Sequence, residues 1–426
     1  MATRWAAGTI LTALAVTGLV IGVTAPGMAQ SAALNSVVSE NPVDFTPHVL
    51  NGKVKAIAQV GGLVVVGGEF TTIRDAGSTA QINQANLFAF NASTGRIVKT
   101  FAPRIDGIVE TVAAGPTRGT VIVGGNFRQV NGSSQRALTT LRLSDGSRVT
   151  SFSATTNGQV NKVLVRGNRL IVGGEFTAIG GSNRARLAVV NATTGAVESG
   201  FNLPVDGNRK PTLQPKPLVF EMDATSDGHY LVILGNFLTV DRKSRNQVAI
   251  IDLQSNSVTP WSSPRTSSLC GNSVAFFFSD VEIAPSNDWF VLVARGGYST
   301  SGMCDTASRW ALSPGSTNAQ PQWINYTGGD TLWSVAVTPA AVYVGGHQRW
   351  LDNPNCDNCQ GPGAVSRPGI GAISPSSGKA LSWNPTRTRG VGAQELVATS
   401  RGLYVGSDTQ KLGREYHARI GLFPAS

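Results

Sequence analysis

Charged side chains are scarce in this sequence: they make up 14% of its 426 residues, compared with roughly 25% in an average globular protein. This scarcity excludes a helical protein rich in Glu and Lys. Apolar residues reach 41%, which is enough for a hydrophobic core. That content excludes a disordered chain and a small scaffold held together mainly by disulfides.

Long apolar runs are absent after residue 29, so no later segment is expected to cross a membrane. Residues 1–29 resemble an export signal, because Arg4 precedes the uncharged stretch 10–23 and small residues at 27–29 suit a signal peptidase. The mature chain is expected to start near Gln30. An uncleaved anchor is the alternative, but the run is shorter than the roughly 20 residues that span a bilayer.

Acidic residues are outnumbered, 25 to 35, which leaves a formal net charge of +10. A charge of this sign favours anionic partners. No run of five basic residues occurs, so a nucleic-acid partner is not expected. The alternative is that the excess of positive charge is spread over a large surface and forms no binding site.

Glycine is abundant, with 49 residues, and part of it recurs in a repeated unit. A β-branched run ending in two small residues occurs seven times, with its first glycine at positions 67, 124, 173, 235, 296, 345 and 406. An aromatic residue, often followed by proline, also recurs seven times, as in Phe101-Ala102-Pro103. Repeats of this length predict four short strands each.

These repeats predict an all-β fold, a seven-bladed β-propeller. In the first repeat we expect strand A at 54–60, strand B at 63–66, strand C at 86–90 and strand D at 97–101. The repeats start out of phase, so Asp44 to His48 is expected to complete the last blade beside 419–423 and to close the ring. The expected organisation is a signal peptide at 1–29, a short lead at 30–42 and one propeller at 43–426.

The repeats resemble a known family. The Val-Gly-Gly-Glu/Asn-Phe units, with the C-terminal runs Tyr343-Val344-Gly345-Gly346-His347, Arg349-Trp350, Arg367-Pro368-Gly369-Ile370, Trp383-Asn384-Pro385 and Leu403-Tyr404-Val405-Gly406-Ser407-Asp408-Thr409, are similar to secreted actinobacterial propellers of the delta-60 repeat type. The resemblance covers essentially the whole mature chain. It implies a propeller fold and an extracellular or wall-associated location, and the family has no assigned reaction. Cys270 and Cys304 look like the family's pair.

The four cysteines, an even number, suit an oxidising compartment. The expected pairs are Cys270 with Cys304 and Cys356 with Cys359. Cys270 falls in a D-to-A loop and Cys304 in a B-to-C loop of the same blade, so a bridge between them is geometrically reasonable. The second pair departs from the family pattern; a loop-stiffening disulfide is expected there, with a redox-active Cys-x-x-Cys as the alternative.

Chain direction alternates within a blade, so D-to-A and B-to-C connections emerge on one face. The long insertions fall on that face, which makes it the candidate binding surface. Two sets of repeated polar residues also point there: Glu69, Asn126, Glu175, Asn236, His347 and Asp408 follow the glycines, and Arg136, Arg184, Arg245, Arg309, Arg367 and Arg419 lie near strand C. They form either a ring of ligand-binding charges or a repeated structural clamp tied to a carboxylate or amide.

The repeat symmetry breaks most in blades five and six. The candidate ligand-binding residues are His347, Arg349, Trp350, Arg309, Trp310, Arg367 and Asp408. Trp and Arg are typical of binding hot spots and of sugar-stacking platforms. The alternative is that both tryptophans pack between blades and that His347 satisfies a buried polar group.

Catalytic motifs are missing. The sequence has no P-loop and no Gly-x-Ser-x-Gly elbow, and its four histidines, His48, His229, His347 and His417, show no metal-ligand spacing. No catalytic residue, metal or cofactor is therefore expected. A propeller enzyme gathers residues from separate blades, however, so spacing along the chain does not test the central channel.

The sequence thus favours a secreted, non-catalytic propeller that binds a protein or an anionic or glycan polymer of the cell envelope on its long-loop face. The alternatives are a hydrolase or lyase acting on a polysaccharide, and a purely structural surface module. An enzyme predicts carboxylates or histidines with shifted pKa values clustered in the channel, with a cleft open to solvent. A binding module predicts no such cluster.

Overall fold

The computed structural model describes residue 1 and residues 34–209, 214–270, 276–298 and 302–426. The expected export signal at 1–29 lies outside these residues, apart from Met1. Across the described ranges the chain forms 37 strands and one 3-10 helix, η1 (Pro264–Ser267). No helix in this part of the chain is long and apolar enough to cross a membrane.

Seven sheets of three or four strands, called sheets 1 to 7 in chain order, account for most of the described strands. Sheet 1 consists of β2 (Lys53–Val60), β3 (Leu63–Glu69) and β6 (Leu87–Asn91). Sheet 2 consists of β7 (Ile108–Ala114), β8 (Thr120–Asn126) and β11 (Leu138–Arg142). Sheet 3 consists of β12 (Val160–Arg166), β13 (Arg169–Gly174) and β16 (Leu187–Asn191). Sheet 4 consists of β18 (Leu218–Ala224), β19 (Tyr230–Asn236), β22 (Val248–Asp252) and β23 (Ser257–Val258).

Sheet 5 consists of β24 (Phe277–Ile283), β25 (Trp289–Arg295), β26 (Thr306–Ala311) and β27 (Trp323–Tyr326). Sheet 6 consists of β28 (Leu332–Val337), β29 (Val342–Gly346) and β32 (Ile370–Ile373). Sheet 7 consists of β33 (Ala393–Thr399), β34 (Gly402–Ser407) and β37 (Ile420–Pro424). Every pairing within these sheets is antiparallel.

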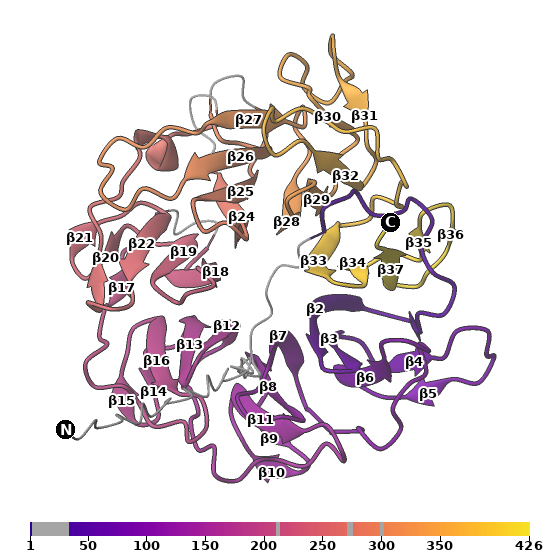
Figure 1. Cartoon of the computed structure of the whole chain (residues 1–426), viewed down its shortest axis with the longest axis vertical. Coiled ribbons are helices and arrows are strands. Elements are labelled where there is room, and N and C mark those ends of the chain that lie inside the picture. Colours follow the sequence, from indigo (N-terminus) through magenta and orange to yellow (C-terminus); the bar gives the residue numbers. More distant parts are fainter. Residues whose placement is uncertain (2–33, 210–213, 271–275, 299–301) are drawn as a thin grey trace.

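The sheets are arranged around a centre, with the first strand of each innermost (Figure 1). The hydrophobic core lies between neighbouring sheets: one buried cluster joins Ala56 and Val65 of sheet 1 to Val109 and Val121 of sheet 2. Sheets packed face to face around an axis are the architecture of a β-propeller.

The repeated glycine pair exists because the sheets pack so closely. A Cβ on Gly67 would lie 2.4 Å from Val109 Cγ1 of the next sheet, and a Cβ on Gly68 would lie 2.2 Å from the Lys53 carbonyl of its own sheet. The same relation recurs at Gly406, where a Cβ would lie 2.7 Å from Val54 Cγ1 of sheet 1. Sheets 7 and 1 are therefore in contact.

The outer strand is shorter than the sequence predicts in sheets 1, 2, 3 and 6. In sheet 1 the expected strand at 97–101 reduces to a single bridge between Phe90 and Ile97. The chain leaves the ladder because Phe101 turns into the core, where it is 1% exposed. The expected strands A, B and C correspond to β2, β3 and β6, and their ends differ by three residues at most.

Short strands fill the B-to-C connections, where the sequence suggests only loops. The short strands are β4 (Thr72–Arg74), β5 (Ile82–Asn83), β9 (Gln129–Val130), β10 (Ser133–Ser134), β14 (Ala178–Ile179), β15 (Ser182–Asn183), β20 (Thr239–Val240), β21 (Lys243–Ser244), β30 (Trp350–Leu351), β31 (Val365–Ser366), β35 (Lys411–Leu412) and β36 (Glu415–Tyr416). The D-to-A connections pair with them, through β1 (His48–Val49) to β4 and β17 (Val205–Asp206) to β20. Both kinds of connection therefore lie on one face, as alternating chain direction predicts.

Sheet 5 has a disulfide where sheets 1 to 4 and sheet 7 have such pairing. Cys270, in the D-to-A connection, is bonded to Cys304, in the B-to-C connection. The second expected disulfide, Cys356 to Cys359, is also present. Both pairings predicted from the sequence are confirmed.

The N-terminal segment lies beside the last strand, β37, but starts earlier than the sequence predicts. Ser39 N donates to Pro424 O and Val43 N to Leu422 O, each at 2.9 Å. Residues 44–48, expected in this role, instead lead into β1. Leu34 and Val38 of the expected lead are buried in the core cluster of sheets 6 and 7, so this lead packs with the propeller.

Candidate functional site

A cavity of about 250 Å³ opens among the innermost strands. Each of these strands has a β-bulge near its start, and the bulged residues are Lys55, Glu110, Asn161, Phe220, Ser279, Trp333 and Gln394. All seven line the cavity. We call this set the bulge ring. Bulges re-aim side chains and are common beside functional sites, and here they direct one residue from every sheet toward the same space.

One side of the cavity is aromatic. The guanidinium of Arg295 lies over the rings of Phe220, Trp333 and Phe277, with its carbon 4.9, 5.0 and 5.6 Å from the ring centroids. The indole Nε1 of Trp333 donates to Val391 O at 2.9 Å. These contacts hold the aromatic rings in place, and rings of this kind stack against sugars.

The other side is polar. Lys55 and Glu110 form an ion pair across sheets 1 and 2, and Asn161 Nδ2 donates to Val219 O at 2.7 Å. Gln159, Gln214 and Gln394 contribute amide groups to the lining. The lining as a whole has five acidic residues, Glu110, Glu175, Glu221, Asp280 and Glu395, and two basic ones, Lys55 and Arg295. The cavity is therefore acidic although the chain is basic.

Carboxyl groups with shifted pKa values cluster around Lys162, whose Nζ lies 2.8 Å from Glu221 Oε1. Burial raises the pKa of Glu395 to about 7, with Lys162 opposing the shift. Burial and the charge of Glu221 raise the pKa of Asp280 well above its usual range. Burial would lower the pKa of Lys162, but Glu221, Glu395 and Asp280 outweigh it and raise that pKa.

Two carboxylates in this region, those of Asp280 and Asp223, join neighbouring sheets. Asp280 Oδ2 accepts from Val335 N at 2.9 Å, and Asp223 Oδ2 accepts from Ile283 N at 2.8 Å. Asp280 Oδ1 accepts from Val281 N as well. Glu395 differs: within the described part of the chain its carboxyl group makes no such bond to a main-chain amide, and the charges that act on its pKa are those of Lys162 and Glu221. The channel thus holds the cluster that the sequence analysis associates with an enzyme, although much of it is engaged in holding sheets together.

A second cavity of about 540 Å³ adjoins the first and shares Gln159 and Glu175 with it. Asn126, Arg136 and Glu175, from the repeated polar sets, line it together with Arg186 and Lys216. Part of the repeated set therefore does face open space. The two cavities together extend from the channel across sheets 2 and 3.

The expected site in sheet 6 is largely occupied by internal contacts. Arg349 donates to Asp330 through Nε at 2.8 Å and through Nη2 at 3.2 Å, and its guanidinium lies over Trp350, 4.4 Å from the centroid. Arg389 binds the same carboxylate at 2.9 Å. His347 Nδ1 contacts Gly390 O. His347, Arg349 and Trp350 lie together, but the guanidinium of Arg349 and Nδ1 of His347 already have partners.

Of the other expected residues, Arg367 adjoins this group, since its main-chain N donates to Arg349 O at 2.8 Å, whereas Arg309 and Trp310 lie on β26 of sheet 5. Trp310 is fully buried, donates to Ser308 Oγ at 2.8 Å and packs against Trp261, so it is closed to a ligand in this structure. Arg309 stacks on Trp289 and donates to Pro375 O. Asp408 accepts from the amides of Val391 and Gly392. Asp408 thereby holds residues 391 and 392 in place. Because Val391 O accepts the hydrogen bond from Trp333, Asp408 supports one wall of the cavity.

The repeated arginines act mostly as a clamp, with main-chain carbonyls as acceptors. Arg184, Arg245 and Arg367 donate to Phe201, Thr259 and Leu381 of the following outer segment. In sheets 1 and 2 glutamines do the same, from Gln84 to Pro103 O and from Gln135 to Ala154 O. We call this site the clamp position; His417 occupies it in sheet 7, two residues before Arg419.

Sequence reasoning missed the bulge ring. Its members are chemically different, whereas the apolar residues around them repeat. The bulge ring could have been identified from one position that occurs in every repeat but holds a different residue type in each. The sequence places the candidate binding surface on the connecting loops, whereas the bulge ring lies on the innermost strands.

The fold and this central cavity define the chain as a β-propeller. A family model described as "Domain of unknown function (DUF5122) beta-propeller" matches residues 168–201, from the turn before β13 of sheet 3 to the aromatic residue Phe201. No curated protein matches the chain.

Among solved structures, the β-propeller domain of Cps50 (Swd1) from Myceliophteria thermophila is similar, with a TM-score of 0.54. The two chains are 10% identical, over 89% of this chain and 99% of that one. An identity this low supports the fold alone. The delta-60 repeat type and an actinobacterial origin stay predictions.

Proposed function

We propose that this chain is an exported seven-bladed propeller of the delta-60 repeat type that binds a neutral or amino-sugar glycan of the cell envelope at the channel mouth. The channel mouth is the 250 Å³ cavity with its bulge ring. Two disulfides are compatible with an extracellular location.

Circular closure is supported by one repeated hydrogen bond. In sheets 1, 2 and 3 an outer amide donates to the middle of the third strand: Val98 to Ala89 O, Val149 to Thr140 O and Glu198 to Val189 O. In sheet 7 the equivalent donor is Val43, which bonds to Leu422 O. The N-terminal segment therefore takes the place of an outer strand.

The observation that carries the glycan proposal is the division of the bulge ring into an aromatic and a polar side. Aromatic rings stack on the apolar face of a sugar, while amides and carboxyl groups bind its hydroxyls. Burial raises the pKa of Glu395 and Asp280, so part of the lining is protonated near neutral pH and suits a neutral or amino-sugar glycan. Arg136, Arg186 and Lys216 in the adjoining cavity lie where the chain of a longer glycan would continue.

Calorimetric titration with envelope oligosaccharides tests this proposal. Trp333→Ala is expected to weaken binding by at least about tenfold, because the ring forms the stacking side. Trp350→Ala is the matched control, since Trp350 lies on β30, outside the channel mouth. Equal weakening by Trp350→Ala, or unchanged binding by Trp333→Ala, would refute the proposed location.

The second candidate function is glycan hydrolysis, which the raised pKa of Glu395 favours. A carboxyl group that keeps its proton near neutral pH can donate it to a leaving glycosidic oxygen while water attacks the sugar. Reducing ends released from the same oligosaccharides measure this activity. Glu395→Gln should abolish release while keeping binding. Absence of release by the unmodified chain excludes hydrolysis of these substrates and leaves the binding function.

A further inference from the structure

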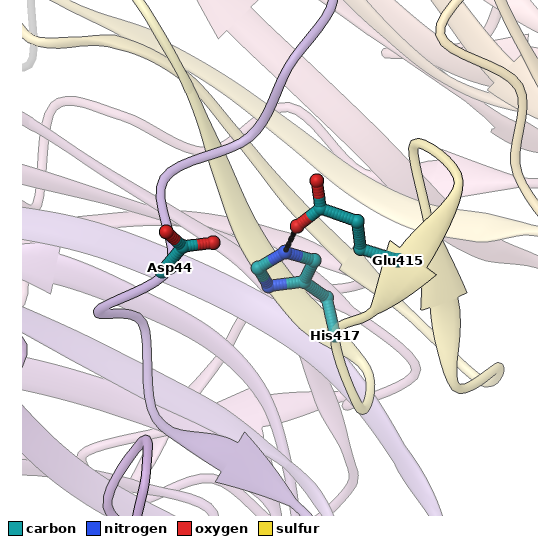
Figure 2. Close-up of side chains that lie close together, drawn as sticks. All are labelled: Asp44, Glu415 and His417. Atoms are coloured by element: carbon teal, nitrogen blue, oxygen red, sulfur yellow. Dashed lines mark ion pairs between the residues drawn. The ribbon is translucent and has the colours of Figure 1, made fainter.

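A second group of polar side chains lies outside the channel, where the two ends of the chain meet. Asp44, Glu415 and His417 each offer one ligand atom, and these three atoms lie within 4.8 Å of one another. Asp44 comes from the N-terminal segment, while Glu415 and His417 come from the end of the β35–β36 hairpin (Figure 2). Both carboxylates are exposed, and the imidazole is buried.

The buried histidine supplies an independent indication of a ligand. His417 is 3% exposed, yet its Nε2 has no hydrogen-bond partner. Glu415 Oε2 lies 3.6 Å from that nitrogen, which is too far for a hydrogen bond. Figure 2 shows the carboxylate of Glu415 beside the ring and Asp44 on its other side. A buried polar atom without a partner in a native site requires an explanation, such as a bound ion.

The other ring nitrogen of His417, Nδ1, is placed so that Nε2 is free to bind a metal. Nδ1 of His417 lies 3.4 Å from Thr46 Oγ1. A metal on Nε2 requires the proton to be on Nδ1, where this hydroxyl oxygen can accept it. A ligating histidine commonly donates its second N–H to a neighbouring acceptor, which fixes the ring orientation.

We propose that Asp44, Glu415 and His417 bind a divalent cation of the zinc class, which clasps the N-terminal segment to the last sheet. An imidazole with two carboxylates suits zinc and its first-row neighbours, whereas calcium takes oxygen ligands. Two carboxylates balance the charge of the ion. Three protein ligands leave further coordination positions for water, in keeping with the exposure of Asp44 and Glu415.

A second imidazole lies next to the site, since the ring centroid of His48 is 6.4 Å from that of His417. A metal binds the neutral form of imidazole, so its affinity for this site should fall at low pH.

His417 occupies the clamp position of sheet 7. In other sheets the side chain there ties the hairpin to an outer segment of the same repeat, whereas here the outer segment comes from the other end of the chain. A metal ion would strengthen this contact between the N-terminal segment and the last sheet, which are not linked directly along the chain. Sequence spacing could not indicate it, because Asp44 and His417 are 373 positions apart.

The test is a calorimetric titration of the chelator-treated full chain with zinc chloride, and with calcium chloride as the second probe. Zinc is expected to bind with one site per chain and to raise the Tm by at least about 3 °C. Asp44→Asn and Glu415→Gln should each weaken zinc binding at least about tenfold. Both residues are exposed, so the variants should match the unmodified chain in Tm when chelator is present.

Asp252→Asn is the matched control. His229 Nε2 lies 3.6 Å from Asp252 Oδ2, the same separation as in the proposed site, but among the described residues no second carboxylate joins this pair to form a group of three ligands. This variant should bind zinc as the unmodified chain does. Absence of zinc binding, zinc binding unchanged in both carboxylate variants, or tighter binding of calcium than of zinc would each overturn the proposal.

Discussion

At the scale of single residues, the backbone before the third strand of every sheet has an unusual conformation. Asn86, Ala137, Arg186, Gln247, Asp305, Gly369 and Arg419 all have positive φ, from 49° to 74°. Only one of the seven is a glycine, the residue that adopts this conformation at least cost. The fold therefore imposes the conformation on residues that do not favour it, which is why the sequence did not reveal it.

Gly369→Ala tests this strain. Gly369 has φ of 74°, and a Cβ there would lie 3.0 Å from Arg387 O. We expect a loss of about 1 to 3 kcal/mol in the free energy of unfolding, measured by chemical denaturation. Gly363→Ala is the control, because its φ is 80° but its Cβ would meet nothing within 4 Å. If both variants lose the same amount, the contact with Arg387 contributes nothing.

The raised pKa of Glu395, about 7, predicts a pH-dependent stability. The folded chain holds this proton more tightly than the unfolded chain, where the pKa is about 4.5. The resulting stabilisation is complete below pH 4.5 and is lost as the pH rises to 7. Relative to Glu395→Gln, the unmodified chain should lose up to about 3 kcal/mol across this window. A difference between the two denaturation curves that does not change with pH would contradict the assignment.

At the scale of elements, the connections on one face are joined to one another in nearly every repeat. Short strands or bridges make the joint around β4, β9, β14, β20 and β35. In sheet 5 the Cys270–Cys304 disulfide makes it instead. The disulfide thus replaces strand pairing as the means of holding the D-to-A connection to the B-to-C connection.

Replacing both Cys270 and Cys304 with Ser should therefore destabilise the chain strongly. The bridge spans a sequence separation of 34 residues, so its loss is expected to lower the free energy of unfolding by roughly 3 to 4 kcal/mol. The Cys356–Cys359 bridge spans 3 residues, and its loss should cost roughly 2 kcal/mol in the same chain-entropy treatment. Denaturation midpoints that fall equally in both double variants would contradict this order.

At the scale of the whole molecule, the N-terminal segment contacts sheets that lie far from it in sequence. Val38 N donates to Tyr343 Oη at 2.9 Å, and Trp383 Nε1 donates to Ser39 O at 3.1 Å. Together with the bond from Val43 to Leu422, these contacts fasten the segment to sheets 6 and 7. If the proposed ring closes here, the segment supports the whole fold.

A chain that starts at Pro47 should then be less stable than one that starts at Leu34. Loss of buried Leu34 and Val38 alone is expected to cost roughly 3 to 6 kcal/mol, and exposure of the edge of β37 adds an aggregation hazard. Denaturation midpoints and light scattering measure the two effects. Equal midpoints for the two chains would exclude a role for this segment in closure.

Much of the fold could be predicted because its cause lies in local repetition. The glycine pairs recur wherever one sheet packs against the next, and Gly67 against Val109 shows the physical reason. Cys270 and Cys304 could be paired because strand alternation places their loops on one face. The short strands β9 and β10 were not foreseen, since runs of two residues leave no periodic signal.

The candidate site was much less predictable. Trp310 and Trp350 belong to the same residue type and have similar neighbours in sequence, yet one is fully buried and the other half-buried. Glu395 carries no local sign that burial will raise its pKa. Such properties depend on which side chains from other sheets surround a residue.

The sequence by itself determined the all-β propeller class and the positions of the inner strands, because both follow from a pattern repeated along the chain. It also determined both disulfides, because only four cysteines are present and the loops that carry Cys270 and Cys304 lie on one face. Only the tertiary structure decided which residues meet at the centre and which meet at the joint between the two ends. Bulges turn one unlike residue from every sheet into the same cavity, and packing brings Asp44 to His417. Those encounters depend on distances through space, which a repeat pattern does not encode.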